Sequence, residues 1–409
     1  MLAVRCENGL RRVEQVFASE FALRSLPLIA CLAMAACSSG ADAPASNASR
    51  AVTYGRVVTS DATARVVVMA GGLEHPWGMA FLPDDRALVT EKPGRLRIVT
   101  LDGHVGEPIG GVPKVHTVEQ GGLLDVAIDP EFATDRFVYL SYAEPREGGA
   151  TGTSVARAKL SADDRTLEEL KIIFRQQPSK PGGHHFGSRL VFARDGRLFV
   201  TLGERNKYRE FAQTLDTHLG KVVRIESDGR VPADNPFVGR AGALPEIWSY
   251  GHRNVQGAAL SPTTGELWTD EHGPQGGDEL NIDRAGRNYG WPKITYGREY
   301  SGGKVSDYTS LPGMEQPAHY WVPSIATSGL MFYTGDKFPQ WRGNAFVGGL
   351  KSQSIARLEL NGDKVVREER LFEGKLHARV RNLEQGPDGL IYVLTDEMGD
   401  ALLRIEPAR

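Results

Sequence analysis

Two short apolar runs meet at an Asp-Gly pair in the segment Arg189-Leu-Val-Phe-Ala-Arg-Asp-Gly-Arg-Leu-Phe-Val-Thr201. Each run has the length of a β-strand. Asp and Gly supply the backbone angles that a tight turn between antiparallel strands needs. The segment therefore predicts a β-hairpin.

The same hairpin pattern recurs along the chain, which makes the repeat the main signal of architecture. Its other copies are Gly78-Met-Ala-Phe-Leu-Pro-Asp-Asp-Arg-Ala-Leu-Val-Thr90, Leu124-Asp-Val-Ala-Ile-Asp-Pro130 with Arg136-Phe-Val-Tyr-Leu140, Gly257-Ala-Ala-Leu-Ser-Pro-Thr-Thr-Gly-Glu-Leu-Trp-Thr269, Gly329-Leu-Met-Phe-Tyr333 with Asn344-Ala-Phe-Val-Gly348, and Leu383-Glu-Gln-Gly-Pro-Asp-Gly-Leu-Ile-Tyr-Val-Leu-Thr395. Several copies continue into a third strand, as at Gly94–Val99 and Ser354–Leu358. Spacings of roughly 45–75 residues fit blades of four strands. We predict an all-β fold, a six-bladed β-propeller of four-stranded antiparallel blades. A β-sandwich would not require six copies of one hairpin.

Composition excludes several classes of function. The chain has 48 basic and 51 acidic residues and a formal net charge of −3, so nothing favours nucleic acid or an anionic membrane surface as a partner. Its 47 Gly and 23 Pro favour sheet and turn over helix. No interior apolar run approaches the roughly 20 residues of a transmembrane helix.

The N-terminal segment is typical of an export signal. Four arginines precede a short apolar run that ends in Met34-Ala-Ala-Cys37, a pattern similar to a bacterial lipoprotein processing site. An ordinary cleaved signal with an incidental cysteine is the alternative, and Leu28-Ile-Ala-Cys31 is a competing site. We predict a signal at 1–37, a flexible tether at 38–60 and the propeller at 61–409. The predicted location is the periplasm, with a lipid anchor through Cys37 in the outer membrane. That anchor would be the protein's membrane contact. All three cysteines precede residue 38, which excludes a disulfide framework in the globular part.

Polar, glycine-rich insertions separate the hairpins and are the candidate functional segments. Gly182-Gly-His-His-Phe-Gly-Ser-Arg189 carries two adjacent histidines, whose side chains cannot both point into a core. A histidine at this place faces the channel of a propeller, although a plain surface role fits the residues as well. Arg253 in Gly251-His-Arg-Asn-Val-Gln-Gly257 offers a planar fork for anions, or a structural ion pair between blades.

A third insertion and a set of cations complete the candidates. Glu271-His-Gly-Pro-Gln-Gly-Gly-Asp-Glu-Leu-Asn281 supplies backbone carbonyls and carboxylates, the hard oxygens that Ca²⁺ prefers, but an acidic turn has the same composition. Lys351, Arg379 and Arg381 precede or begin late strands, which indicates either a multiply anionic ligand or scattered surface charge.

Taken together, the motifs resemble the soluble quinoprotein glucose and aldose sugar dehydrogenases, which bind pyrroloquinoline quinone (PQQ). The resemblance covers residues 65–407 and rests on the order of seven motifs: Leu73-Glu-His-Pro-Trp-Gly78, Gln120-Gly-Gly-Leu-Leu124, His184-His185 with Arg189-Leu190, Gly251-His-Arg-Asn254, Glu271-His-Gly-Pro274, Asp278-Glu-Leu-Asn281 and Asn288-Tyr-Gly-Trp-Pro292.

The resemblance implies a role for each matched residue. His185 would be the base that takes the proton of the sugar's C1 hydroxyl while hydride passes to the quinone, and Arg253 would stabilise charge on the reduced quinone. The other implied cofactor contacts are Gln120, Asn254, Lys351, Arg379 and Arg381. The carbonyls of Gly273 and Pro274 would bind the Ca²⁺ that polarises the quinone, and Glu279 with the carbonyl of Tyr289 would bind a second, structural Ca²⁺. Glu204 would lie beside the base and the sugar.

Two departures point to the broad-specificity aldose branch of that family. His184 stands where glucose dehydrogenases have Asp. His319 and Val322 replace the aromatic residues that grip the sugar, although Tyr320 and Trp321 are adjacent and are the predicted substrate contacts. The implied partners are aldose sugars and an external electron acceptor such as a cytochrome, a quinone or a dye. The protein itself would be a monomer or a dimer.

Two other functions use a similar fold. A calcium-dependent lactonase-like hydrolase would need a ring of carboxylate and Asn ligands at the channel floor. A non-catalytic binding propeller would leave His185, Arg253 and the Gly273-Pro274 carbonyls without a role. The cationic residues together with a calcium loop favour the dehydrogenase.

Overall fold

The computed structural model describes residues 53–408. The predicted signal at 1–37, with Cys37, and tether residues 38–52 lie outside this range. Residues Thr53–Val58 fall within the predicted tether but form strand β1, which pairs with β2 (Thr63–Glu74). The folded part therefore begins before residue 61, because β1 obtains main-chain hydrogen bonds from a longer strand.

Residues 53–408 form six antiparallel sheets, and all six predicted hairpins are present. Three sheets have four strands. Their strands are β11 (Gly187–Phe192), β12 (Leu198–Leu202), β13 (Lys221–Ile225) and β14 (Ile247–Tyr250); β15 (Val255–Leu260), β16 (Leu267–Glu271), β17 (Asp278–Asp283) and β18 (His319–Trp321); and β19 (Thr327–Phe332), β20 (Ala345–Gly349), β21 (Ser354–Asn361) and β22 (Lys364–Leu371).

The other three sheets depart from four strands. The sheet of β6 (Leu123–Ile128), β7 (Phe137–Pro145), β8 (Ala150–Leu160) and β9 (Leu167–Arg175) gains the short β10 (Lys180–Pro181). The first sheet has only β3 (Pro76–Phe81), β4 (Ala87–Glu91) and β5 (Arg95–Val99). The last sheet joins β23 (Val380–Gln385), β24 (Ile391–Thr395) and β25 (Met398–Pro407) to β2 and β1.

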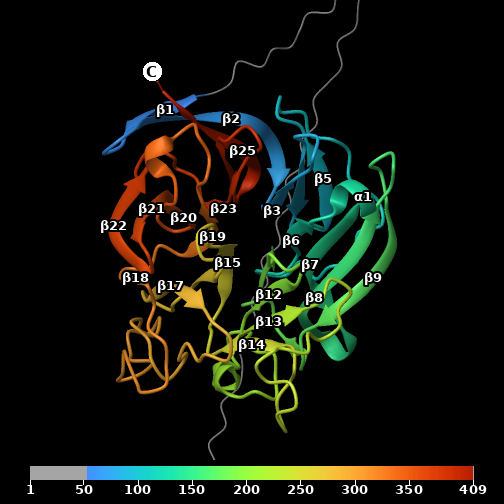
Figure 1. Cartoon of the computed structure of the whole chain (residues 1–409), viewed down its shortest axis with the longest axis vertical. Helices are drawn as coiled ribbons and strands as arrows, with labels where there is room; N and C mark the ends of the chain where they lie inside the picture. Colours follow the sequence, from blue (N-terminus) through green and yellow to red (C-terminus); the bar gives the residue numbers. More distant parts are fainter. Residues whose placement is uncertain (1–52, 409) are drawn as a thin grey trace, which may run out of the picture. The chain divides into compact units, whose positions relative to one another are not determined.

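The six sheets are the blades of a closed six-bladed propeller (Figure 1). The first strand of each blade contacts the first strand of the next, in the order β3, β6, β11, β15, β19, β23 and back to β3. These inner strands surround the channel. The ring closes where β2, from the N-terminal end, pairs with the C-terminal β25. Apolar clusters fill the space between blades; one gathers Trp341, Phe346 and Val393, all buried, from the last two blades.

The inner strands run in the same direction around the ring, so the loops that lead into them meet at one end of the channel. We call these the crossing loops. Several contain a non-glycine residue with positive φ, including His75, Glu119, His185 and Ala326. Such strained backbone is typical of functional sites.

In the described part of the chain, helical structure is confined to short segments of three to five residues. They are α1 (Phe132–Asp135), η1 (Glu147–Gly149), η2 (Arg209–Gln213) and η3 (Pro339–Trp341). Within residues 53–408, no helix has the length and hydropathy that crossing a membrane requires.

Candidate active site

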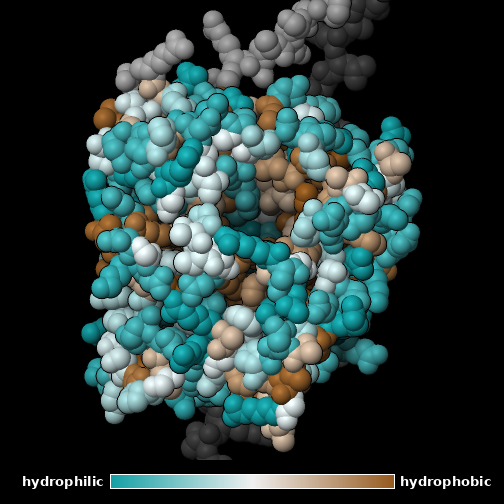
Figure 2. Space-filling model, in the orientation of Figure 1, coloured by the Kyte–Doolittle hydropathy of each residue, from teal (hydrophilic) through white to brown (hydrophobic). Residues whose placement is uncertain are grey.

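A cavity of 310 Å³ lies at the end of the channel where the crossing loops meet. Space-filling atoms show the propeller hollowed near its centre (Figure 2). The residues that line the cavity are His75, Trp77, Lys92, Glu119, Gln120, Gln256, His272, Ala326, Leu350, Arg379, Arg381 and Asp396. Three of the predicted cofactor residues are therefore brought to one cavity: Gln120 and Arg379 from two crossing loops, and Arg381 from the start of β23.

His185 lies beside this cavity and is oriented by two neighbours. The Gln120 side-chain oxygen accepts the His185 backbone N–H at 2.8 Å, which connects the histidine to the cavity wall. The imidazole Nδ1 lies 2.7 Å from Glu204 Oε2 at the end of β12. His185 and Glu204 are 6% and 1% exposed. Because an ionised carboxylate can only accept, Nδ1 carries the proton and Nε2 is left with a free lone pair.

The charges around this pair favour a neutral imidazole and an ionised carboxylate. Burial lowers the pKa of His185, although Glu204 opposes this effect. Burial alone would raise the pKa of Glu204, but His185 and Arg253 outweigh it and hold that pKa below its ordinary value. His185 is thus set up as a proton acceptor at neutral pH.

Arg205 fixes the loop that carries His185, although no sequence motif pointed to it. Its buried guanidinium donates to the carbonyls of His184 (2.8 Å) and Gly182 and lies 4.0 Å from the ring centroid of Phe186. Burial lowers the pKa of Arg205 to about 10. Glu204 and Arg205 are consecutive. The segment that follows β12 therefore orients the His185 imidazole through Glu204 and fixes the backbone before it through Arg205.

Arg253 and Asn254 lie in the next crossing loop. Arg253 Nη1 donates to the carbonyls of His272 (3.0 Å) and Gly273 (2.9 Å), and the Arg253 carbonyl accepts the backbone N–H of Glu204. Three buried polar atoms here have no partner among the described residues: Arg253 Nε, Asn254 Nδ2 and His272 Nε2. Unsatisfied buried donors are costly, so this cluster indicates a ligand.

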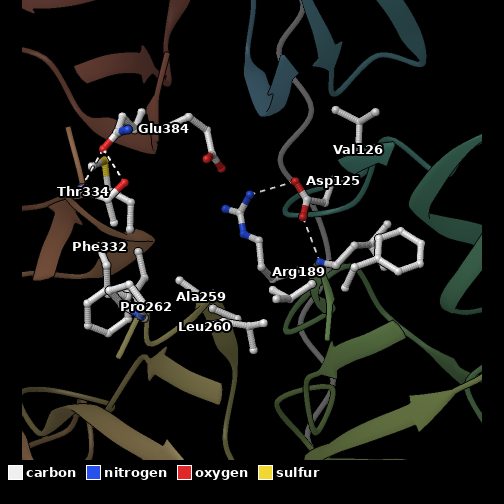
Figure 3. Close-up of a pocket in the computed structure, with 16 residues that line it drawn as sticks. Asp125, Val126, Arg189, Ala259, Leu260, Pro262, Phe332, Thr334 and Glu384 are labelled. Atoms are coloured by element: carbon white, nitrogen blue, oxygen red, sulfur yellow. Dashed lines mark hydrogen bonds and ion pairs between the residues drawn. The ribbon is translucent and has the colours of Figure 1, made fainter. Parts of the chain in front are cut away.

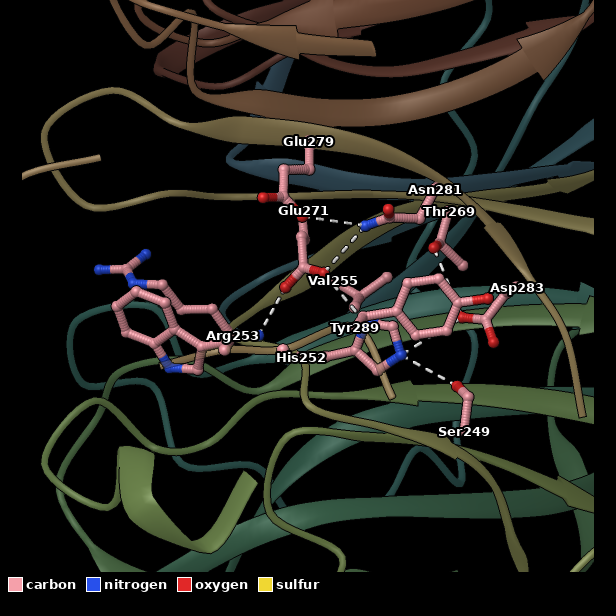
Figure 4. A network of polar contacts seen from close by, with 12 residues as sticks. Ser249, His252, Arg253, Val255, Thr269, Glu271, Glu279, Asn281, Asp283 and Tyr289 are labelled. Atoms are coloured by element: carbon pink, nitrogen blue, oxygen red, sulfur yellow. Dashed lines mark hydrogen bonds and ion pairs between the residues drawn. The ribbon is translucent and has the colours of Figure 1, made fainter. Parts of the chain in front are cut away.

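A buried network holds Arg253 from behind (Figure 4). His252 lies with Nδ1 2.9 Å from Glu271 Oε1 and Nε2 2.9 Å from Ser249 Oγ, and its ring stacks on Tyr289. Glu271 also accepts the backbone N–H of Arg253. Burial would lower the pKa of His252, but Glu271 and Asp283 outweigh it and raise it. The predicted calcium residue Tyr289 therefore packs against the network with its ring.

The predicted cations divide between two cavities. Arg381 is buried, pairs with Asp396 and donates to Gln256 Oε1 at 2.8 Å, while Arg379 is half-buried in the same wall. Lys351 is exposed and lines a neighbouring cavity of 530 Å³ instead. The two cavities adjoin, because Leu350 lines the first and Lys351 the second.

The predicted substrate residues both line the neighbouring cavity but differ in exposure. Trp321 is 3% exposed, and its indole N–H donates to Glu368 at 3.1 Å. Tyr320 is 45% exposed and stacks on Tyr296 with ring centroids 3.8 Å apart. Of the pair, Tyr320 is the one that presents an exposed aromatic ring to the cavity.

The predicted calcium ligands are hard oxygens, and one of them already accepts a hydrogen bond within the protein. The Gly273 carbonyl accepts from Arg253, and Gly273 itself donates its N–H to Asp278 at 2.9 Å. The Asn281 amide donates to the carboxylates of both Glu271 and Glu279, so the two carboxylates lie close together. Burial and the nearby Glu271 raise the pKa of Glu279 well above its ordinary value. The Asn281 Oδ1 is buried without a partner in the described part of the chain. Two close carboxylates and a free amide oxygen are a donor set that suits a cation.

Comparison with known proteins agrees with this geometry. The family model described as glucose/sorbosone dehydrogenase matches residues 73–404. The chain belongs to the glucose/sorbosone dehydrogenase family. The family resemblance predicted from the sequence motifs is thereby confirmed.

Relatives of this family member include enzymes of both glucose and aldose type. The aldose sugar dehydrogenase YliI of Escherichia coli is 46% identical over 349 residues, which are 85% of this chain and 94% of that protein. A crystal structure of a glucose dehydrogenase is 52% identical, covers 84% of this chain and 99% of its own, and superposes with a TM-score of 0.82. A PQQ-bound aldose sugar dehydrogenase from Streptomyces coelicolor is 27% identical, with a TM-score of 0.69 over 84% of this chain and 98% of that one.

The chain has a further cavity, of 340 Å³, at the other end of the channel (Figure 3). Arg189 Nη1 donates to Asp125 Oδ1 at 2.8 Å, and Glu384 points toward the same space. Burial raises the pKa of Glu384 to about 8. A lactonase would need a ring of carboxylate and Asn ligands at this depth. Asp125 and Glu384 are the carboxylates that line this cavity, and Asp125 is engaged by Arg189 and by the Leu190 N–H, which leaves Glu384 alone. The geometry therefore disfavours the hydrolase alternative.

Proposed function

We propose that the protein oxidises aldose sugars at C1 to lactones, with PQQ as the electron acceptor in the 310 Å³ cavity and Ca²⁺ as a second cofactor. The observation that carries the proposal is the His185–Glu204 pair. In this pair Glu204 orients a buried imidazole, and the His185 backbone N–H donates to Gln120 in the wall of a cavity that Arg379 and Arg381 also line. The Streptomyces coelicolor relative supports PQQ as the cofactor.

The residues present fit the cofactor. PQQ bears carboxylates and an ortho-quinone, so its cavity must supply cations and hydrogen-bond donors. Arg379 and Arg381 supply the cations. Arg253 Nε and Asn254 Nδ2 are buried donors without a partner in the described chain, and Arg253 also donates to the carbonyl of His272 in the cavity wall. When bound, the quinone provides the acceptor for two electrons from the sugar.

His185 performs the proton step. Its Nε2 accepts the proton of the C1 hydroxyl, and Glu204 stabilises the imidazolium that results through the Nδ1 hydrogen bond. As this proton leaves, hydride would pass from C1 to the bound quinone. The sugar thus gives up one proton, to His185, and one hydride, which carries the two electrons to the cofactor. Arg253 would stabilise negative charge that develops on the acceptor.

The calcium part of the proposal rests on the oxygen donors. The carbonyls of Gly273 and Pro274 would contribute to an ion beside the cofactor, with the remaining ligands from the cofactor and water, because Ca²⁺ takes six to eight oxygens. The Glu279 carboxylate and the Tyr289 carbonyl would hold a second ion with a structural role. The approach of Glu279 and Glu271 to one Asn281 amide, with the Asn281 Oδ1 buried and without a partner in the described chain, supports a cation there.

The substrate is proposed to be an aldose in general. Tyr320, with Tyr296 stacked behind it, offers one aromatic face, and Lys351 lines the same cavity. His319 and Val322 stand at the positions where glucose-selective enzymes carry aromatic residues that grip the sugar. One open aromatic face imposes less selectivity than an aromatic clamp. Electrons would then leave to an external acceptor.

Export is proposed from the N-terminal residues alone. We expect processing before Cys37 and a lipid anchor that holds the protein in the periplasm at the outer membrane. Mass spectrometry of the mature N-terminus tests this, with Cys37→Ser as the comparison. An unmodified N-terminus beyond residue 37 would contradict the anchor.

Reconstitution tests the activity. Apoprotein stripped with a chelator is mixed with PQQ and Ca²⁺, and reduction of a redox dye is followed with a panel of aldoses. The proposal expects reduction that requires PQQ, Ca²⁺ and sugar together. An assay in which no aldose supports PQQ-dependent reduction would overturn it.

A further inference from the structure

Lys92 lies in the turn between β4 and β5 and lines the cofactor cavity, although no motif in the sequence marked it. Its backbone is fixed on both sides: its N–H donates to the His75 carbonyl at 3.1 Å, and its carbonyl accepts the Leu123 N–H at 3.0 Å. The side chain is half-buried and donates from Nζ to the Glu119 carbonyl at 3.1 Å. An ammonium has three donors, so two remain for another partner.

The carboxylates that line the cavity already have partners other than Lys92 and Arg379. Asp396 accepts from Arg381 and lies 3.1 Å from His75 Nδ1. The Glu119 carboxylate pairs with His184 at 2.6 Å. Within residues 53–408, neither Lys92 nor Arg379 has a carboxylate within ion-pair distance. The cavity wall therefore carries an excess of positive charge.

That excess is unfavourable until an anion enters. Burial lowers the pKa of Lys92, and the guanidiniums of Arg381 and Arg379 lower it further against the opposing effect of Asp396. A half-buried cation beside two others is poorly stabilised without a partner. A carboxylate placed among the three would relieve the repulsion and accept from the free Nζ donors.

We propose that Lys92 is a binding residue for PQQ, its ammonium pairing with a carboxylate of the cofactor opposite Arg379. This inference rests on the proposed function. Lys92, in the first blade, adds a cation to Lys351, Arg379 and Arg381, which the family resemblance assigns to the cofactor in the last two blades. The cofactor would then be held by charge from two sides of the channel.

Equilibrium binding tests the inference without relying on turnover. Chelator-stripped wild type, Lys92→Met, Lys92→Arg and Lys364→Met are titrated with PQQ in the presence of Ca²⁺, and the quenching of tryptophan fluorescence is followed. Trp77 in the cavity wall provides the signal. Lys364 is exposed on β22 and serves as a matched control for the loss of one lysine charge. The thermal unfolding of each apoprotein is measured in parallel.

We expect Lys92→Met to weaken PQQ binding by about 10- to 100-fold, the usual effect of losing a charge-assisted hydrogen bond. Lys92→Arg should recover most of the affinity, and Lys364→Met should match wild type. The unfolding temperature of the Lys92→Met apoprotein should not fall, because an unneutralised charge has been removed. Equal affinity of Lys92→Met and wild type would overturn the inference, as would a loss of affinity that follows a lower unfolding temperature and is not rescued by Arg. If wild type itself bound no PQQ, the proposed function would fail first, and this inference with it.

Discussion

At the scale of single residues, the site depends on how His185 is held. Glu204 fixes its tautomer from one side, and Gln120 fixes its backbone from the other. Arg205 then anchors the preceding residue through the His184 carbonyl. The neighbouring histidine has a different environment: His184 is partly exposed and pairs with Glu119 at the rim. The two adjacent histidines therefore have separate roles, and substitutions should separate them.

Replacement of His185 tests the base. We expect His185→Ala to lower kcat by at least about 10²–10⁴-fold, the usual contribution of a general base. PQQ affinity should stay close to that of wild type, because the cavity cations remain. Dye reduction and fluorescence titration give the two quantities, and His184→Ala serves as the control with a much smaller loss. Near-normal turnover of His185→Ala would show that another group is the base.

Glu204 should set the pH dependence. The base must be neutral to accept a proton, and burial lowers the pKa of His185, so kcat/KM should rise with pH along a limb below the ordinary value for histidine of about 6.5. Glu204 opposes that lowering by stabilising the imidazolium. Glu204→Gln should therefore move the limb to lower pH and also reduce the plateau. A pH–rate profile measures both, and a limb that moves to higher pH would contradict the assignment.

At the scale of elements, each blade must bring its inner strand close to the next one. Gly257 at the start of β15 shows the constraint: a Cβ there would overlap the Asp270 carboxylate and the Ser328 carbonyl of the following inner strand. Asp270 is itself buried, and burial raises its pKa well above the ordinary value. The contact between blades leaves no room for a side chain.

Gly257→Ala should therefore destabilise the propeller. We expect the free energy of unfolding to fall by about 1–3 kcal/mol, as for other overpacked interiors. Gly71→Ala is the control, because nothing lies within 4 Å of a Cβ at that position, and its effect should stay within about 0.5 kcal/mol. Chemical denaturation measures both. Equal stabilities of the two variants would contradict the packing described.

Features that repeat locally could be predicted from the sequence, whereas features that depend on contacts between blades could not. The hairpins could be predicted because each one shows its turn and its strand periodicity within about a dozen residues. The crossing loops could be singled out because glycine and histidine gather there. Lys92 and Arg205 could not, since each is an ordinary basic residue until ring closure places it against another blade. The three-stranded first blade was also missed: residues after β5 form isolated bridges, such as Val99 with Val105, in place of a fourth strand.

At the scale of the whole molecule, the ring depends on pairing between its two ends. Strand β2 pairs with β25 along most of its length, and buried Val66 lies opposite buried Ile405. The predicted boundary at residue 61 would keep this pairing and lose only β1. A boundary at residue 71 would remove the closure.

Two truncated chains separate these effects. A chain that begins at Asp61 should fold and keep most of its stability. A chain that begins at Gly71 should lose about 4 kcal/mol or more, because at least two buried valines, Val66 and Val67, leave the closing sheet. Thermal and denaturant unfolding compare the two. Equal stability would show that closure does not depend on β2.

The central claim is that the cavity joins a cofactor to a base that acts on sugars, and a single anaerobic turnover tests it most directly. Apoprotein loaded with one equivalent of PQQ and with Ca²⁺ is mixed with an aldose in the absence of any dye, and the absorption of the bound cofactor and the lactone formed are measured together. We predict complete reduction of the bound PQQ and one lactone per loaded chain, with almost no reduction over the same period in His185→Ala. Cofactor that binds but stays oxidised with every aldose, or that is reduced as fast in His185→Ala, would contradict the account.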